Sequence, residues 1–141
     1  MSDSETLRSI DLTRIGDARY KATNKRGGVL PIGSGEDPDF TPVELLLAAI
    51  AGCSAIDVDA ITGKRAQPES FDVHCSADKV RDDDGNHLTN VQITFNVVFP
   101  EGDAGDAARE FLPRSIEMSR DRLCTVSRTV ALPTEVEYHR A

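Results

Sequence analysis

The residues of this chain with the widest chemistry are its three cysteines, Cys53, Cys75 and Cys124. An ionised thiol can attack an electrophile, exchange with a disulfide or bind a metal ion. The cysteine spacing contains no Cys-x-x-Cys pair, so it matches neither a disulfide framework nor a zinc motif. The three histidines show no metal-ligand spacing either. The question that the sequence raises is therefore which of the thiols reacts.

Cys75 is expected to be an inert residue of the core. It lies in phase with Phe71, Val73 and Ala77, which alternate with polar residues as in a half-buried strand. Side chains two positions apart on a strand point to the same face of the sheet. We therefore expect the Cys75 thiol to behave as a small buried hydrophobic group.

Cys53 and Cys124 each have a charged residue one helical turn further along the chain. Asp57 would raise the pKa of the Cys53 thiol, so a reactive Cys53 needs an arginine or lysine from elsewhere in the protein. Arg128 would lie on the side of Cys124 if that segment is helical. From the local sequence alone, a core cysteine at 53 and a half-buried cysteine at 124 remain the simpler interpretation.

The strongest helix-start signal lies at residues 41–44, Thr-Pro-Val-Glu. Threonine at the N-cap, proline at the first helical position and glutamate at the third form a capping box. The predicted helix runs from Pro42 to about Thr62. Residues 45–53 are apolar on every side, which is typical of a helix surrounded by protein. In a domain of this size, such complete enclosure favours a dimer.

Strands and helices are segregated along the rest of the chain, which predicts an α+β domain rather than a parallel βαβ array. A meander, an alternating hairpin and a second helix are expected, followed by short helical turns and a last strand. The meander covers residues 9–15, 19–23 and 29–32, and the hairpin covers 71–77 and 91–97, with its turn at 82–86. The second helix covers 103–118 and is expected to be interrupted or kinked at Pro113. The short helical turns cover 119–130, and the last strand covers 134–139.

Composition and charge limit the partners that this protein can have. With 39% hydrophobic and 28% charged residues, the 141 residues are expected to form one globular domain over 1–141. The net charge of −8 repels nucleic-acid phosphates and anionic lipids. The apolar run at 45–53 is far shorter than the ~20 residues of a membrane helix, and the N-terminus lacks the apolar part of a signal peptide. We therefore expect a cytoplasmic protein without a nucleic-acid or membrane partner.

Two separate segments resemble the cysteine motifs of the OsmC/Ohr family of thiol peroxidases. Residues 41–58 (TPVELLLAAIAGCSAIDV) resemble the cysteine helix of that family, and residues 119–130 (SRDRLCTVSRTV) resemble its second cysteine motif. The version of the motifs found here is more similar to the OsmC-like branch than to Ohr proper. The resemblance implies an α+β fold with antiparallel sheets and a central buried cysteine helix, in an intertwined homodimer.

The resemblance also implies a reaction. Cys53 would attack an organic hydroperoxide and become a sulfenic acid, and Cys124 would condense with it to a disulfide. A dithiol reductant, such as a lipoylated protein, would then reopen the disulfide. A second thiol protects the first from oxidation to the sulfinic level. No metal, flavin or other cofactor is required.

The family uses an arginine and a glutamate beside the reactive cysteine. Arg19 is the candidate for the arginine, although Arg14 and Arg26 lie close by, and Glu44 is the match for the glutamate. Glu44 precedes Cys53 by nine positions, where Ohr has ten. At about 100° per residue, nine steps put the two side chains on opposite faces of a regular helix, so they would meet only across a dimer or through an irregular first turn. The capping box explains Glu44 without catalysis.

The sequence therefore predicts a dimeric, cysteine-based peroxidase acting on organic hydroperoxides in oxidative stress defence. The apolar wall of the cysteine helix favours alkyl or lipid peroxides over hydrogen peroxide. The alternative is an OsmC-like dimer that binds an apolar small molecule or senses redox state without efficient turnover. A third interpretation, an inert dimeric scaffold, requires both cysteines to be buried and unreactive.

Overall fold

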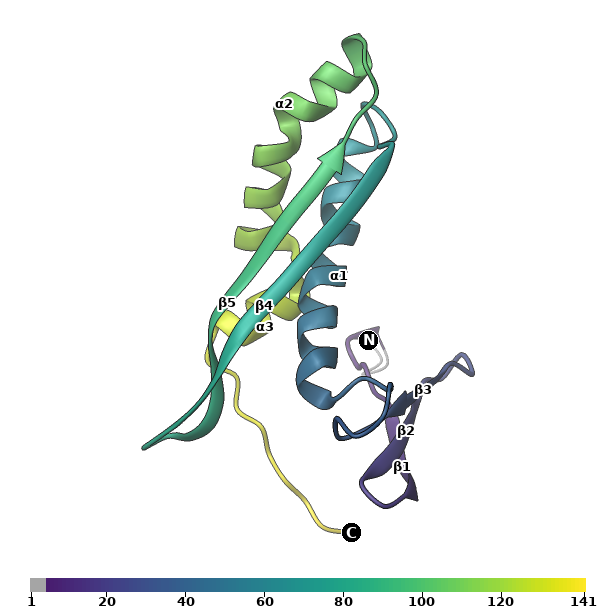
Figure 1. The fold of residues 1–141 in the computed structure, drawn as a ribbon, viewed down its shortest axis with the longest axis vertical. Helices are drawn as coiled ribbons and strands as arrows, with labels where there is room; N and C mark the ends of the chain where they lie inside the picture. The colour runs from purple at the N-terminus through teal and green to yellow at the C-terminus, as the bar shows by residue number, and fades with distance from the viewer. Residues whose placement is uncertain (1–4) are drawn as a thin grey trace. The chain divides into compact units, whose positions relative to one another are not determined.

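A computed structural model describes residues 5–141 of the chain (Figure 1). The charged N-terminus, on which the expectation of no signal peptide rests, lies partly outside these residues. The chain divides between Leu46 and Leu47 into two units, which are described separately below. The prediction of one domain over residues 1–141 stays a prediction.

The first unit contains a three-stranded antiparallel meander, as its sequence predicts. Strands β1 (Asp11–Gly16), β2 (Arg19–Thr23) and β3 (Val29–Ile32) follow one another in the sheet in chain order. The turn between β2 and β3 is closed by Asn24, whose side-chain oxygen accepts hydrogen bonds from the backbone N–H groups of residues 26 and 28. Short alternating strands joined by tight turns need no distant contacts, so local sequence predicts them well.

The long helix α1 (Pro42–Thr62) begins and ends where the sequence predicts. Its capping box is formed: the Thr41 N–H donates to Glu44 Oε1 at 2.9 Å, and the Glu44 N–H donates to Thr41 Oγ1 at 3.2 Å. At the other end, the Thr62 hydroxyl donates to the Val58 carbonyl at 2.9 Å. The capping-box bonds satisfy groups at the start of the helix that would otherwise need water.

Within one chain, helix α1 is buried along a single stripe only. The buried residues recur every fourth position, at Ile50, Ser54, Val58 and Thr62. On another face of the helix, Ile56 is 73% exposed. Within the second unit, α1 is therefore covered on one side only, which is less than the complete enclosure that the apolar run predicts.

Helix α1 is also long and apolar enough to cross a membrane, judged by length and composition alone. The core helix of a soluble protein satisfies the same criterion, so this is weak evidence for a membrane span.

The second unit is built on the predicted hairpin of β4 (Ser70–Asp82) and β5 (Gly85–Val98). Both strands extend further into the predicted turn than expected. Asp82 pairs directly with Gly85, whose φ of 94° is the left-handed conformation that glycine adopts most easily. The Asp82 carboxylate accepts the Asp84 N–H at 2.9 Å. The turn therefore shrinks to two residues.

Three helical segments follow the hairpin: α2 (Asp103–Met118), the π-helical turn η2 (Ser119–Leu123) and α3 (Thr125–Ala131). Figure 1 shows α2 and the second half of α1 on the same side of the hairpin. Helix α2 runs through Pro113, so of the interruption or kink expected there, the interruption is absent. Its start requires a glycine at 105, because a Cβ there would lie 1.6 Å from the Pro100 carbonyl oxygen.

Aromatic side chains join these elements. The rings of Phe71 and Phe95 meet edge to face across the hairpin, with their centroids 6.2 Å apart. The guanidinium of Arg65, just after α1, lies 3.7 Å from the centroid of the Phe111 ring on α2. Such contacts add to the apolar area that the unit buries.

The strand predicted at residues 134–139 is wrong. The described chain has no helix or strand after α3, and Val136 and Tyr138 are 71% and 92% exposed. Alternation alone does not form a strand, because a strand needs a neighbour to accept its backbone hydrogen bonds.

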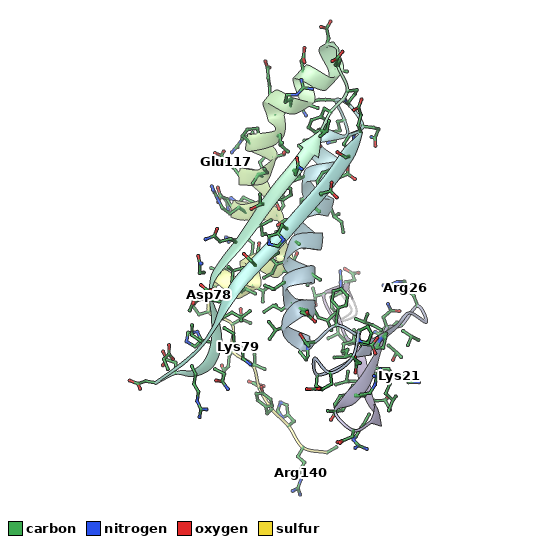
Figure 2. All side chains as sticks on the ribbon, in the orientation of Figure 1. Lys21, Arg26, Asp78, Lys79, Glu117 and Arg140 are labelled. Carbon is green, nitrogen blue, oxygen red and sulfur yellow. The ribbon has the colours of Figure 1, made fainter. Side chains whose placement is uncertain are left out.

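Charged side chains are distributed over the surface of both units. Among those labelled in Figure 2, Glu117 on α2 and Lys79 on β4 are exposed in the second unit, and Lys21 on β2 is exposed in the first. The negative net charge reflects an excess of acidic over basic residues, 24 against 16.

Candidate functional site

The second unit brings together the two cysteines that the sequence singles out. Cys53 and Asp57 lie one turn apart on α1, and Cys124 lies between η2 and α3. The Sγ atoms of Cys53 and Cys124 and a carboxylate oxygen of Asp57 all lie within 4.8 Å of one another. Both cysteines are free thiols in this structure. The two sulfurs, distant in sequence, are therefore neighbours in space.

The backbone around Cys124 holds its sulfur in place. The Cys124 N–H donates to the Ser119 carbonyl at 2.9 Å, which closes the π-helical turn η2. Cys124 is then the N-cap of α3, and its sulfur accepts the Ser127 N–H at 3.4 Å. The side chain is completely buried, whereas Cys53 is half-buried.

Hydrogen bonds lower the pKa of the Cys124 thiol below its ordinary value. Burial alone would raise this pKa, but four donors to the sulfur outweigh that effect. They are the hydroxyls of Ser127 and Ser54, the backbone N–H of Ser127 and the thiol of Cys53. Hydrogen-bond donors stabilise the negatively charged sulfur directly, so the Cys124 thiol loses its proton more easily than the Cys53 thiol.

The pKa of the Cys53 thiol is shifted in the opposite direction. Burial raises it most, the Val126 N–H lowers it, and the neighbouring Cys124 sulfur and Asp57 carboxylate raise it further. The Cys53 thiol therefore ionises less easily than the Cys124 thiol. The influence of Asp57 has the sign that the sequence predicts.

The Asp57 carboxylate is held by a buried hydroxyl. Ser119, which is 1% exposed, donates from its Oγ to Asp57 Oδ2 at 3.0 Å. Sequence reasoning identifies Asp57 as a neighbour of Cys53 but misses Ser119, Ser54 and Ser127. Nothing in the local sequence marks these serines, because their role depends on η2 and α3 folding back onto α1.

A cavity of about 250 Å³ lies beside the cysteine pair. Apolar side chains of β5 and α2 form much of its wall, and serines line the part nearest the thiols. The lining residues are Ser54, Val91, Ile93, Phe95, Ile116, Ser119, Arg120 and Ser127. An apolar cavity with a few polar groups is typical of a small-molecule site.

Arg19 and Glu44, the other two predicted site residues, lie in the first unit. The Arg19 guanidinium contacts Asp37 Oδ2 at 2.7 Å and also pairs with Asp39. The Glu44 carboxylate accepts the Thr41 N–H in the capping box. Because Cys53 lies in the second unit, a role for either residue at the thiol stays a prediction.

Cys75 lies on β4 opposite Ile93 and is half-buried. The alternation predicted for this strand is confirmed, since residues 71, 73, 75 and 77 are half-buried and those between them are exposed. Burial raises the pKa of the Cys75 thiol, which keeps it protonated at neutral pH. This environment agrees with a structural cysteine.

Replacing Ser127 by alanine is expected to raise the pKa of Cys124, because it removes one hydroxyl donor and leaves the backbone N–H in place. The thiolate of the variant should therefore form at higher pH than that of the parent protein. Ultraviolet thiolate absorbance during a pH titration, in a Cys75→Ser background, measures the shift. The exposed Thr125→Ala is the matched control, and identical curves for the two variants would contradict the assignment.

A family model described as "OsmC-like protein" matches residues 33–139, so the chain belongs to the OsmC-like protein family. An OsmC-like protein from Vibrio cholerae has 15% identity and a TM-score of 0.72, over 86% of this chain and 91% of that one. An OsmC-like protein from Mycoplasma pneumoniae has 14% identity and a TM-score of 0.65, over 88% of both chains. For an OsmC-like hydroperoxide resistance protein from Jannaschia, the values are 15% and 0.51, over 92% and 88%. No curated protein matches the chain.

These structures confirm the predicted fold class, α+β with antiparallel sheets. The family membership and the adjacent cysteines together indicate a redox role for the site.

Proposed function

We propose that this protein is a cysteine-based peroxidase that reduces organic hydroperoxides through Cys53 and Cys124. The observation that carries the proposal is the approach of the two sulfurs to within 4.8 Å of each other. A disulfide needs an S–S distance of about 2.05 Å, which side-chain rotation and a small shift of the short segment after η2 would supply.

The reaction balances with the groups at the site. Once the pair has lost one proton, the remaining proton passes from Cys53 to Cys124, and the resulting Cys53 thiolate attacks the terminal peroxide oxygen. The O–O bond breaks, the alkoxide takes a proton from water to leave as the alcohol, and Cys53 becomes a sulfenic acid. Cys124 sulfur then attacks Cys53 sulfur, and the hydroxide leaves as water with the Cys124 proton. The sulfurs lose two electrons in total, which a dithiol later restores.

Three further features belong to the proposal. The chain would act as a homodimer, because one chain leaves a face of the apolar α1 uncovered. The dimer would lie in the cytoplasm. Arg19 would stabilise the Cys53 thiolate, and its two carboxylate partners would fix the orientation of the guanidinium. Glu44 would assist Arg19. The reductant would be a dithiol, for which a lipoylated protein is the candidate.

The cavity supports the substrate class. Its walls of valine, isoleucine and phenylalanine side chains suit an alkyl or lipid chain better than hydrogen peroxide. The same cavity favours the second candidate function, the binding of an apolar small molecule without efficient turnover. The lowered pKa of Cys124 favours it too, because the thiol that ionises more easily is the buried one.

Treatment of the fully reduced protein with one equivalent of cumene hydroperoxide distinguishes the two functions. The peroxidase should lose two of its three thiols within seconds, and peptide mapping should find the Cys53–Cys124 disulfide. Cys75→Ser, the matched control, should form the same disulfide. Retention of all thiols under these conditions would refute the peroxidase, and apolar-ligand binding by such a protein would favour the second function.

A further inference from the structure

We propose that Cys53, Cys124 and Asp57 form a three-ligand site for a thiophilic divalent cation such as Zn²⁺. This inference goes beyond the proposed peroxidase, since it concerns a ligand that the reaction does not use. It rests on an arrangement that sequence spacing conceals: two thiols and one carboxylate, from α1 and the start of α3, with their donor atoms within 4.8 Å of one another.

The distances suit such a cation after a small adjustment. Zinc binds thiolate sulfur at about 2.3 Å and carboxylate oxygen at about 2.0–2.2 Å in tetrahedral sites, which places neighbouring ligand atoms about 3.6–3.8 Å apart. The three donor atoms would have to close by at most about 1.2 Å, which is within the range of side-chain rotation. Three protein ligands leave the fourth position open to water.

Two of the three ligands are already oriented by hydrogen bonds of the kind that surround metal sites. Ser119 Oγ donates to Asp57 Oδ2 at 3.0 Å, which leaves the other carboxylate oxygen for the cation. The Ser127 N–H donates to Cys124 Sγ at 3.4 Å, an interaction that a metal-bound thiolate retains. Such partners fix ligand geometry and raise affinity. Both serine donors therefore act as positioning residues.

The charge of the site also favours a cation. The Asp57 carboxylate lies beside two thiols, so the three groups bring negative charges together when both thiols are ionised. A divalent cation offsets the repulsion between these charges, because it attracts all three groups. Among the described residues, no other group of three metal-binding side chains is found this close together.

Cation binding and disulfide formation would exclude each other. A cation held by both thiolates leaves neither sulfur free to attack. Conversely, an oxidant that takes two electrons from the pair joins the sulfurs and removes two of the three ligands, so the cation is released. The oxidant can be diamide, which is reduced to its hydrazine by the two electrons and two protons of the thiols.

Anaerobic titration of the reduced full-length protein with Co²⁺ tests the site, since thiolate-to-cobalt charge transfer gives an ultraviolet band. We expect one Co²⁺ per chain, displaced by Zn²⁺. The thiolate-to-cobalt band of the complete site should be absent in Cys53→Ser and also in Cys124→Ser. Asp57→Asn should weaken binding by more than the ~10–100-fold that loss of an outer partner causes, and Ser119→Ala should weaken it about 10-fold.

Matched controls make the test specific. Asp59→Asn changes an exposed carboxylate of the same helix, and Cys75→Ser removes the third thiol, so both should bind Co²⁺ as the parent protein does. Equal affinity of the Asp57→Asn and Asp59→Asn proteins, loss of binding in Cys75→Ser, or absence of the band in the reduced protein would each overturn the proposal. Circular dichroism establishes that each variant is folded.

The two proposals can fail separately. Diamide should prevent Co²⁺ binding whether or not the protein reacts with hydroperoxides, and the dithiol dithiothreitol should restore it. A protein that binds Co²⁺ as expected but does not react with cumene hydroperoxide would retain the metal site and lose the peroxidase. Co²⁺ binding that survives verified Cys53–Cys124 disulfide formation would overturn the metal site alone.

Discussion

Replacing Cys53 by serine is expected to abolish hydroperoxide consumption, by about 10³-fold or more, because a serine hydroxyl cannot replace an oxidisable thiol as the nucleophile. The variant should form no intramolecular disulfide when treated with cumene hydroperoxide. Serine is close in size to cysteine, so the half-buried site on α1 should accommodate it. Peroxide loss in the presence of a dithiol, followed by colorimetric assay, measures the effect.

Cys124→Ser should behave differently from Cys53→Ser. If Cys53 is the attacking residue, it should still be oxidised once, and without a partner sulfur it should proceed to the sulfinic acid under excess peroxide. Mass spectrometry separates these products. Cys75→Ser should retain full activity. Peroxide consumption by Cys53→Ser at the parent rate, with Cys124 oxidised instead, would show that the roles of the two cysteines are reversed.

The electrostatics of the reduced pair are the physical reason to test for this reversal of roles. Four donors lower the pKa of Cys124, whereas burial and two neighbouring groups raise the pKa of Cys53. A more buried thiolate is less accessible to a substrate, so Cys124 gains ionisation at the expense of access. In the proposed mechanism the proton moves between the two sulfurs before attack.

Replacing Ile56 by glutamate is expected to dissociate the proposed homodimer. Ile56 lies on the uncovered side of α1 and is 73% exposed in one chain. If the partner chain covers it, the substitution removes apolar contact and buries an unpaired charge, at a cost of about 3–5 kcal/mol. The dimer dissociation constant should rise by roughly 10²-fold or more. Sedimentation velocity across a concentration series measures the change.

The control for this substitution is Ala107→Glu, which adds the same charge to an exposed position on α2. This variant should remain dimeric. A parent protein that sediments as a monomer at every concentration, or an Ile56→Glu variant that remains as dimeric as the control, would contradict the proposed interface. Loss of the dimer should also lower the stability of the chain, because the apolar residues of α1 would then face water.

Local patterns determined the elements of this protein. The start of α1 follows from the Thr41–Glu44 capping box and the existence of the hairpin from alternation, since hydrogen bonds and side-chain faces within a few residues decide them. The interruption expected at Pro113 and the strand expected at 134–139 are absent, because the outcome there depends on packing and on a neighbouring strand. The two cysteines of interest came from the resemblance of their motifs to a family, not from their spacing.

Tertiary structure alone decided what surrounds those cysteines. It brought Cys124 to Cys53 and Asp57, and it supplied the hydroxyls of Ser54, Ser119 and Ser127 from three different segments. Sequence could not place these donors, because a serine hydroxyl carries no periodic signal and its partner lies far along the chain. Electrostatic effects act through short distances in space, so which thiol ionises, and whether three ligands can share a cation, is a property of the folded chain.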